Sequence, residues 1–305
     1  MDNVMDNMNL LKWTEEQKNM IRDLIAEEIE KARLSHKFIP ELKLAEDARS
    51  VSADELDSVT YQVDDITTIP LVEIEVPINL TRLQAEDVDL SAALLLIRRA
   101  ANHLARAHDA VVFAGQPGTD LPPLTAPTNV NAIGGRTNGG VSAITTSVDI
   151  GPLVTSSTST TGKGSTTSST ATSGGFASYG EALVAGVANA LVTLEGKGYI
   201  GSYVLVLGQR LFTDANTPSP GSLVLPTDRL KALLGEGPVH RSSVLDQDEG
   251  LLLSLGGEPM DRAVAVAPIF ESLRIGAKDM RECRVFERFA LRLKEKDSVI
   301  KLKRK

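Results

Sequence analysis

The chain has little of what catalytic, redox and nucleic-acid-binding proteins rely on. Its single cysteine, Cys283, excludes an internal disulfide and any metal site built from several cysteines. Aromatic residues make up 4% of the chain, which argues against surfaces that stack bases or sugars. The net charge of −8 argues against nucleic acid as a general partner, because phosphate binding needs a positive surface.

Long apolar runs are also missing. No stretch approaches the roughly 18 apolar residues of a membrane-spanning helix, and no charged start is followed by an apolar run. We therefore expect a cytoplasmic protein with no membrane partner.

No group of residues predicts a catalytic centre. His103 and His108 are five residues apart on an expected helix and point roughly 140° apart, which argues against a shared metal. Cys283 has no base beside it in the sequence and is interpreted as a strand residue. Glu73 and Glu75 share one face of an expected strand and suggest a solvated or subunit-contacting edge. We predict neither a metal nor a cofactor, and no enzymatic activity.

The strongest structural pattern runs from residue 70 to residue 115. Residues 70–80 alternate with a period of two, which predicts a strand whose even-numbered residues are buried. A long helix follows, with Ser91 as its expected N-cap and Phe113 near its end. Its apolar stripe consists of Leu94, Ile97, Ala101, Leu104, Ala105 and His108.

The N-terminal region predicts an amphipathic helix. Thr14 and Gln17 form a capping-box pattern, and the helix extends to about Leu34. Its apolar stripe consists of Trp13, Ile21, Leu24, Ile25, Ile29 and Leu34. The stripe either packs on the chain's own domain or also offers a groove to another chain.

Two segments lack the apolar content of an independent core. Residues 43–69 are acidic with interspersed apolar residues, which favours a hairpin arm that needs a neighbour over a solvated acidic loop. Residues 116–178 are rich in Ser, Thr and Gly, so their most polar part is expected to be flexible, with short strands near residues 141–144 and 148–154. The Gly162–Ser165 stretch lacks the spacing of a phosphate loop.

Regular structure resumes after residue 178. We expect helices at 181–194 and 227–234, and strands at 203–207, 251–255 and 263–267. A half-exposed strand is expected at 285–293, and a solvated basic tail at 301–305.

The order of these elements resembles the encapsulin nanocompartment shell proteins, which are relatives of tailed-phage major capsid proteins. The segments that carry the resemblance are 11–17 with 37–38, 70–83, 88–91 with 108–115, 203–207, and 270–302. It covers most of the chain except residues 116–178.

The resemblance implies an α+β protein with the Hong Kong 97-type phage capsid fold. Residues 1–42 would form an interior N-terminal helix and arm, 43–69 the extended loop, and 70–115 with 179–202 the peripheral domain containing the spine helix. Residues 203–268 would form the axial domain, and 269–305 the C-terminal strands. The insertion 116–178 would lie on the exterior.

The resemblance also implies a function and its sites. Copies of the chain would assemble into an icosahedral shell around a cargo enzyme, such as a ferritin-like protein or a dye-decolorising peroxidase, held by a C-terminal targeting peptide. The docking residues would be Ile21, Leu24, Ile25, Ile29, Leu34 and Phe38. The fivefold pore would be lined by Asp214, Asn216, Thr217 and Ser219. In some members of the family, a Trp in the segment that corresponds to residues 79–83 stacks on a flavin. This chain has Thr81 at that position, so no flavin is predicted.

Two alternatives stay open. One is the major capsid protein of a tailed phage or prophage, although no long scaffolding segment precedes Trp13. The other is an enzyme or a carbohydrate-binding module, which would elute from a sizing column as a small species.

Overall fold

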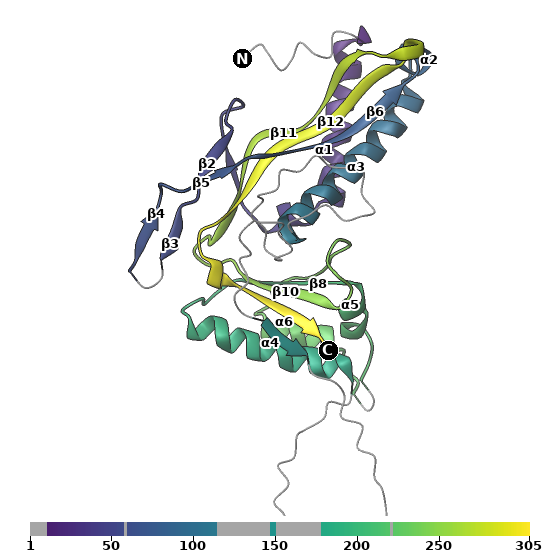
Figure 1. The fold of residues 1–305 in the computed structure, drawn as a ribbon. Coiled ribbons are helices and arrows are strands. Elements are labelled where there is room, and N and C mark those ends of the chain that lie inside the picture. Colours follow the sequence, from purple (N-terminus) through teal and green to yellow (C-terminus); the bar gives the residue numbers. More distant parts are fainter. Residues whose placement is uncertain (1–10, 58–59, 115–146, 151–177, 220–221) are drawn as a thin grey trace, which may run out of the picture. The chain divides into compact units, whose positions relative to one another are not determined.

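The structure is a computed structural model that describes residues 11–57, 60–114, 147–150, 178–219 and 222–305. The chain divides into two compact units (Figure 1). Unit 1 comprises Met1–Thr145 and Gly257–Asp297, and unit 2 comprises Thr146–Gly256 and Ser298–Lys305. Each unit contains its own sheet.

Unit 1 is built on a four-stranded sheet in the order β1-β11-β12-β6. The strands are β1 (Glu41–Lys43), β11 (Met260–Ile275), β12 (Arg281–Leu293) and β6 (Val72–Leu80). The long β11 and β12 form an antiparallel hairpin, β6 pairs antiparallel with β12, and β1 runs parallel to β11. The even-numbered residues of β6 are buried, as the alternation predicts.

Two helices cover one face of this sheet. Helix α1 (Glu15–Ala32) packs on α3 (Ser91–Ala114) and on β11, while α3 packs on β6 and β12. The capping box of Thr14 and Gln17 is confirmed. Helix α3 begins at Ser91 itself, because Leu90 has a positive φ of 50° and ends the preceding turn. The short α2 (Arg82–Glu86) and a 3-10 turn (Ser35–Lys37) complete this layer.

The segment 43–69 forms a hairpin arm on unit 1 and not a solvated loop. Strand β2 (Ser50–Ser52) pairs with β5 (Thr68–Pro70), and β3 (Glu55–Asp57) pairs with β4 (Gln62–Asp64), both antiparallel. Each pair is only three residues long, so the arm derives little stability from its own ladder.

Unit 2 contains a five-stranded sheet in the order β7-β13-β10-β8-β9. The strands are β7 (Ser147–Ile150), β13 (Val299–Arg304), β10 (Glu249–Ser254), β8 (Tyr203–Leu207) and β9 (Val239–Arg241). Helices α4 (Tyr179–Gly196), α5 (Gln209–Ala215) and α6 (Pro226–Leu233) pack with it around an apolar core. Two further 3-10 turns, Ala277–Asp279 in unit 1 and Lys296–Ser298 at the junction, complete the assignment.

Several expectations differ from this architecture. The basic tail was expected to be solvated, but up to Arg304 it is strand β13, held between β7 and β10 with Leu302 buried, and Lys303 and Lys305 are exposed. The strand expected to be half-exposed, β12, is buried over most of its length because it lies between β11 and β6. The insertion contributes β7, and Ile150 of that strand lies in the core of unit 2.

The units also group the elements differently from the expected domains. Helix α4 was expected with the spine helix but belongs to unit 2, since its apolar face packs on that unit's core. The strand predicted at 263–267 was expected in the axial domain, but it is part of β11 in unit 1, because β11 pairs with β12 along nearly its whole length.

Candidate docking and assembly surfaces

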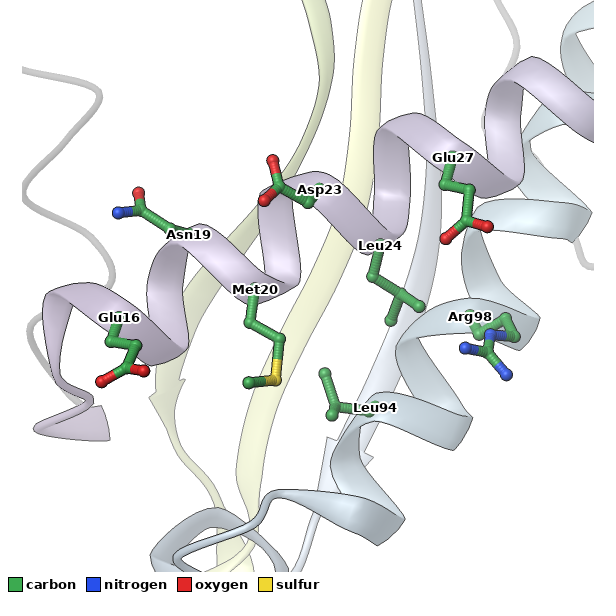
Figure 2. A pocket seen from close by; sticks show the side chains of 8 residues that line it. All are labelled: Glu16, Asn19, Met20, Asp23, Leu24, Glu27, Leu94 and Arg98. Carbon is green, nitrogen blue, oxygen red and sulfur yellow. The ribbon is translucent and has the colours of Figure 1, made fainter.

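A groove lies between α1 and α3 on the surface of unit 1 (Figure 2). It is open and has a volume of about 780 Å³. The residues that line it are Glu16, Asn19, Met20, Asp23, Leu24, Glu27, Leu94 and Arg98.

The centre of the groove is apolar. Figure 2 shows Met20 and Leu24 of α1 directed toward Leu94 of α3. Met20 is 46% exposed, and the two leucines are half-buried. An accessible apolar centre between two helices is the form of surface that receives a side chain from a partner peptide.

The rim of the groove is charged and predominantly acidic. Glu16 lies at one end, and Glu27 and Arg98 lie at the other (Figure 2). Lys31, through a hydrogen bond, and more weakly Arg98 lower the pKa of the Glu27 carboxyl. Within the described residues, Glu16 and Asp23 form no ion pair.

Only one of the six predicted docking residues lines this groove. Leu24 does, whereas Ile21, Ile25 and Ile29 are buried beneath α1 in the chain's own core. Leu34 and Phe38 are half-buried after the helix, and the Phe38 ring stacks on Phe113 at 6.1 Å between centroids.

The structure thus favours own-domain packing for most of the predicted stripe. Met20 was missed because it flanks the apolar stripe of α1. Leu94 was placed in the apolar stripe of α3 but not among the docking residues, because it lies next to Met20 only once α1 and α3 pack. The acidic residues of α1 were visible in the sequence, but nothing in it indicated which of them border a groove.

A buried ionic cluster fixes the end of α1 to the rest of unit 1. The Arg33 guanidinium donates two hydrogen bonds to the Glu287 carboxylate of β12, at 2.6 and 2.7 Å. His108 of α3 lies 3.0 Å from the same carboxylate through Nδ1. The next residue, Asp109, accepts hydrogen bonds from the backbone N–H groups of Leu34 and Ser35 at 2.7 and 3.0 Å.

This cluster has strongly altered acid–base properties. Burial opposes ionisation of Glu287, yet Arg33 and His108 lower its pKa to about 2. Burial, reinforced by Arg33, lowers the pKa of His108 to about 3, so its imidazole is neutral at physiological pH. Burial raises the pKa of Asp109 against the hydrogen bonds from Leu34 and Ser35.

Sequence reasoning assigned His108 to ordinary helix packing and did not find the cluster. A signal was present, because Glu287 shares a strand face with the apolar residues Val285 and Phe289. A carboxylate on a buried face requires a buried partner. The identity of that partner, 254 residues away in the sequence, was not visible.

The opposite face of the unit 1 sheet carries a second set of ion pairs. Glu73 and Glu75, interpreted as a solvated or subunit-contacting edge, both pair with Arg284 of β12, and Glu73 also pairs with Arg288. Burial opposes ionisation of Glu73, but the two arginines lower its pKa. These carboxylates therefore cross-link neighbouring strands of the chain itself.

The hairpin arm has an attached base and an exposed tip. At its base, Ile69 and Leu71 pack against Ala265 and Ala290. Further along the arm, the Leu56 N–H of β3 donates to the Lys294 carbonyl at 2.7 Å. On β4 and at either end of it, Tyr61 is 83%, Val63 57% and Ile66 89% exposed. Three exposed apolar side chains on a projecting hairpin are typical of an interaction surface.

The predicted pore residues are not equally accessible in unit 2. Asp214 lies in α5, with Arg304 Nη1 3.2 Å from its carboxylate, and Ser219 is buried and donates to Glu181 at 3.0 Å. Asn216 and Thr217 are exposed and end α5 by donating to backbone carbonyls at 2.8 Å. Asp214 is half-buried, so Asn216 and Thr217 are the two whose side chains are exposed.

No catalytic or metal site emerges from the described ranges. In them, no three His, Cys, Asp or Glu side chains are grouped to hold a metal ion. Cys283 is a buried strand residue, and burial raises the pKa of its thiol to about 11. Thr81 is the N-cap of α2. Among the described helices, none is long and apolar enough to cross a membrane.

Comparison with solved structures defines the fold class. The chain superimposes on a virus-like particle protein from Pyrococcus furiosus with a TM-score of 0.62, at 12% identity, covering 94% of this chain and 100% of that one. It superimposes on the capsid of an empty GTA particle with a TM-score of 0.54, at 18% identity, covering 88% of each chain. The fold is the Hong Kong 97-type capsid fold, as the sequence predicts.

Sequence comparison connects part of the chain to a particular family. Residues 157–267 match the family described as an encapsulating protein for peroxidase. The chain is 31% identical over 110 residues to the type 1 encapsulin shell protein EncA of Myxococcus xanthus, covering 36% of this chain and 37% of that protein. The match thus spans little more than a third of that relative's length. The predicted resemblance to encapsulin shell proteins is confirmed.

Proposed function

We propose that the protein is a structural subunit that assembles with copies of itself into a closed icosahedral shell in the cytoplasm and encloses a cargo enzyme. The capsid fold, which aligns over 94% of the chain with a virus-like particle protein, is the observation that carries this proposal. The protein itself would catalyse no reaction.

The hairpin arm supports self-assembly. Its β4 region holds Tyr61, Val63 and Ile66 in solvent, where each exposed apolar side chain is unfavourable for an isolated chain. Pairing with a neighbouring copy would bury them, and closed symmetry would repeat this contact for every arm of the shell.

The groove between α1 and α3 supports cargo docking. Its apolar centre, Met20 with Leu24 and Leu94, can take side chains of a short peptide at the C-terminus of a cargo enzyme. The family description names peroxidase as the encapsulated protein, so a peroxidase is our first candidate for the cargo and a ferritin-like protein the second.

The second candidate function is a capsid protein of a tailed phage or prophage. The similarity to the capsid of a GTA particle favours it. Neighbouring genes distinguish the two functions, since a compartment would accompany an enzyme with a C-terminal targeting peptide and a capsid would accompany portal and terminase genes.

Electron microscopy and size-exclusion chromatography of the full-length protein test the assembly. We expect closed particles in the void volume. The Ile66→Asp substitution should prevent particle formation without changing the circular dichroism spectrum, because it places a charge in the expected contact. Ile66→Val, the matched control, should assemble normally. A well-folded monomer of the unmodified chain, or normal assembly of Ile66→Asp, would contradict the proposal.

A further inference from the structure

We propose that the solvent-facing side of α3 binds a small tetrahedral oxyanion, such as inorganic phosphate, through Arg99, His103 and Arg106. These three side chains are called the oxyanion site below. The site is separate from the groove beside α1 and from the hairpin arm, and it is complete in a single chain. It therefore does not depend on assembly of the chain into a shell.

The solvent-facing side of α3 carries charge of one sign. The helix contains Arg98, Arg99 and Arg106, and its one carboxylate is Asp109. Asp109 is buried and accepts hydrogen bonds from two backbone N–H groups that follow α1. The charged side chains that α3 exposes are therefore all basic, in a chain whose net charge is −8. An isolated positive surface on an acidic protein attracts anions.

Arg99, His103 and Arg106 lie on one face of the helix. Their spacings of four and three residues place them on consecutive turns, with neighbouring Cβ atoms about 5–6 Å apart. Arg99 is exposed, and the other two are half-buried. Arg98 is turned by about 100° around the helix from Arg99, and it lines the groove beside α1 (Figure 2). The three side chains of the oxyanion site can thus converge on one ligand.

The donors of this face have no acceptor in the described part of the chain. No described residue forms an ion pair or a side-chain hydrogen bond with Arg99 or Arg106. Arg106 Nε and His103 Nδ1 are buried, and neither atom has a hydrogen-bond partner. A buried N–H group without an acceptor is unfavourable, because it has lost its hydrogen bond to water. An acceptor from outside the chain would remove this cost.

The pKa of His103 shows the sign of the local field. Burial, and then Arg99 and Arg106, lower the pKa of the imidazole. Among the described residues, no carboxylate acts against them. The carboxylate of Glu28 in α1 lies on the side of α3 that faces α1, where it accepts a hydrogen bond from Asn102 at 2.9 Å. The oxyanion site is therefore a positive region with no negative charge of its own.

The donor set fits a tetrahedral oxyanion better than a carboxylate. A carboxylate has two oxygens, and a single guanidinium occupies both through paired hydrogen bonds. A phosphate has further acceptor oxygens for a second guanidinium and for the imidazole. Its charge of about −1.5 to −2 at neutral pH also balances the two arginines.

Isothermal titration calorimetry of the full-length protein with inorganic phosphate, in a chloride buffer free of other oxyanions, tests the site. We expect saturable binding of about one phosphate per chain. Arg99→Gln and Arg106→Gln should each weaken the affinity about tenfold, because each removes a charge-assisted pair of hydrogen bonds. Arg106→Lys keeps the charge but not the paired donors, so its affinity should lie between those of the unmodified chain and Arg106→Gln.

Two controls separate a defined site from general attraction by charge. Arg98→Gln removes the same charge from the same helix but outside the oxyanion site, and it should change the affinity by less than about twofold. Acetate, used as a carboxylate probe, should bind at least about tenfold more weakly than phosphate, because it offers oxygens to only one guanidinium. Circular dichroism spectra should be the same for all variants.

Three results would overturn the proposal. Absence of saturable phosphate binding would remove the site. Equal weakening by Arg98→Gln and Arg99→Gln would mean that phosphate follows net charge only. Acetate binding as tight as phosphate binding would assign the face to a carboxylate, such as one from a second copy of the chain. A chain that binds phosphate but forms no particles would contradict the shell function and leave the oxyanion site standing.

Discussion

The two units of this protein stabilise their interiors in different ways. Unit 1 buries several ionisable side chains, among them Arg33, Glu287, Asp109 and Arg262. Arg33 pairs with Glu287, and Asp109 accepts hydrogen bonds from backbone N–H groups. Unit 2, over its described residues, buries no charged side chain, and its buried polar groups are Ser and Thr hydroxyls. Its charges, such as the Lys301–Glu249 pair, lie at the border of the core.

This difference indicates which substitutions and conditions should destabilise each unit. A buried ion pair contributes little net stability compared with an apolar packing of the same volume, but loss of one partner leaves the other charge unpaired. Unit 1 should therefore respond strongly to single charge substitutions and to pH. An apolar core responds to lost volume instead. The groove and the arm both belong to unit 1, so both proposed interaction surfaces lie on the unit that contains the buried ionic cluster.

The largest effect is expected for Glu287→Ala. It leaves Arg33 buried without its carboxylate and should lower the free energy of unfolding of unit 1 by about 3–5 kcal/mol. Urea unfolding followed by the fluorescence of Trp13 measures this, because Trp13 is the chain's single tryptophan and is buried against Phe270 in unit 1. The control Glu249→Ala in unit 2 should cost at most about 1 kcal/mol. Equal effects of the two substitutions would remove the distinction between the units.

Loss of volume in unit 2 should have the next largest effect. Leu252→Ala removes a fully buried side chain of β10 and should lower the stability of unit 2 by about 3 kcal/mol. Hydrogen exchange of the amides in β8 and β13, the two neighbours of β10, measures the change. The Trp13 signal should stay unaltered. A shift of both signals together would mean that the two units unfold as one.

A change of pH should produce a smaller difference in stability between the two units. The ordinary pKa of the histidine side chain is 6.5. At pH values below 6.5, His108 takes up a proton in the unfolded chain but not in the folded one, because burial and Arg33 lower its pKa to about 3. The unfolded state then binds more protons, so the stability of unit 1 falls as pH falls, by about 1 kcal/mol from pH 6.5 to 5.5. Asp109, whose pKa is raised by burial, has the opposite sign at lower pH.

Urea midpoints of the Trp13 transition at several pH values measure this slope. His108→Gln should flatten it between pH 6.5 and 5.5, because the substituted side chain does not titrate. Hydrogen exchange in unit 2, corrected for the intrinsic pH dependence of exchange, serves as the internal control. A slope that persists in His108→Gln would assign the pH dependence to another group.

Substitution of the helix-capping residues should have the smallest effect on stability, and this effect should be similar in the two units. Thr14 caps α1 in unit 1, and Ser178 caps α4 in unit 2, each by accepting a backbone N–H at 3.2 Å. Substitution of either by Ala should cost about 1 kcal/mol. Similar values for the two, measured by the same unfolding signals, would confirm that the contrast between the units arises in their cores.

Local patterns in the sequence predicted the local elements well. The alternation in β6, the capping box of Thr14 and Gln17, and the long helix ending near Phe113 all appear in the structure. These features depend on neighbours in the sequence, whose spacing is fixed by helix and strand geometry. The order of such elements was enough to indicate the capsid fold.

The candidate site was predicted only in outline. The sequence identified α1 as amphipathic, but it proposed the buried Ile21, Ile25 and Ile29 as docking residues along with Leu24. An apolar stripe has the same appearance whether it faces the chain's own core or a partner. Only the packing of α3 against α1 decided that Met20 and Leu94 remain accessible.

The sequence by itself determined the helices, most of the strands and their order, because hydrophobic period and capping act over a few residues. The tertiary structure alone decided that Glu287 meets Arg33 and His108, that the tail is a strand of unit 2, and that α4 joins that unit. Those outcomes depend on which distant surfaces exclude water together, and no spacing along the chain encodes that choice.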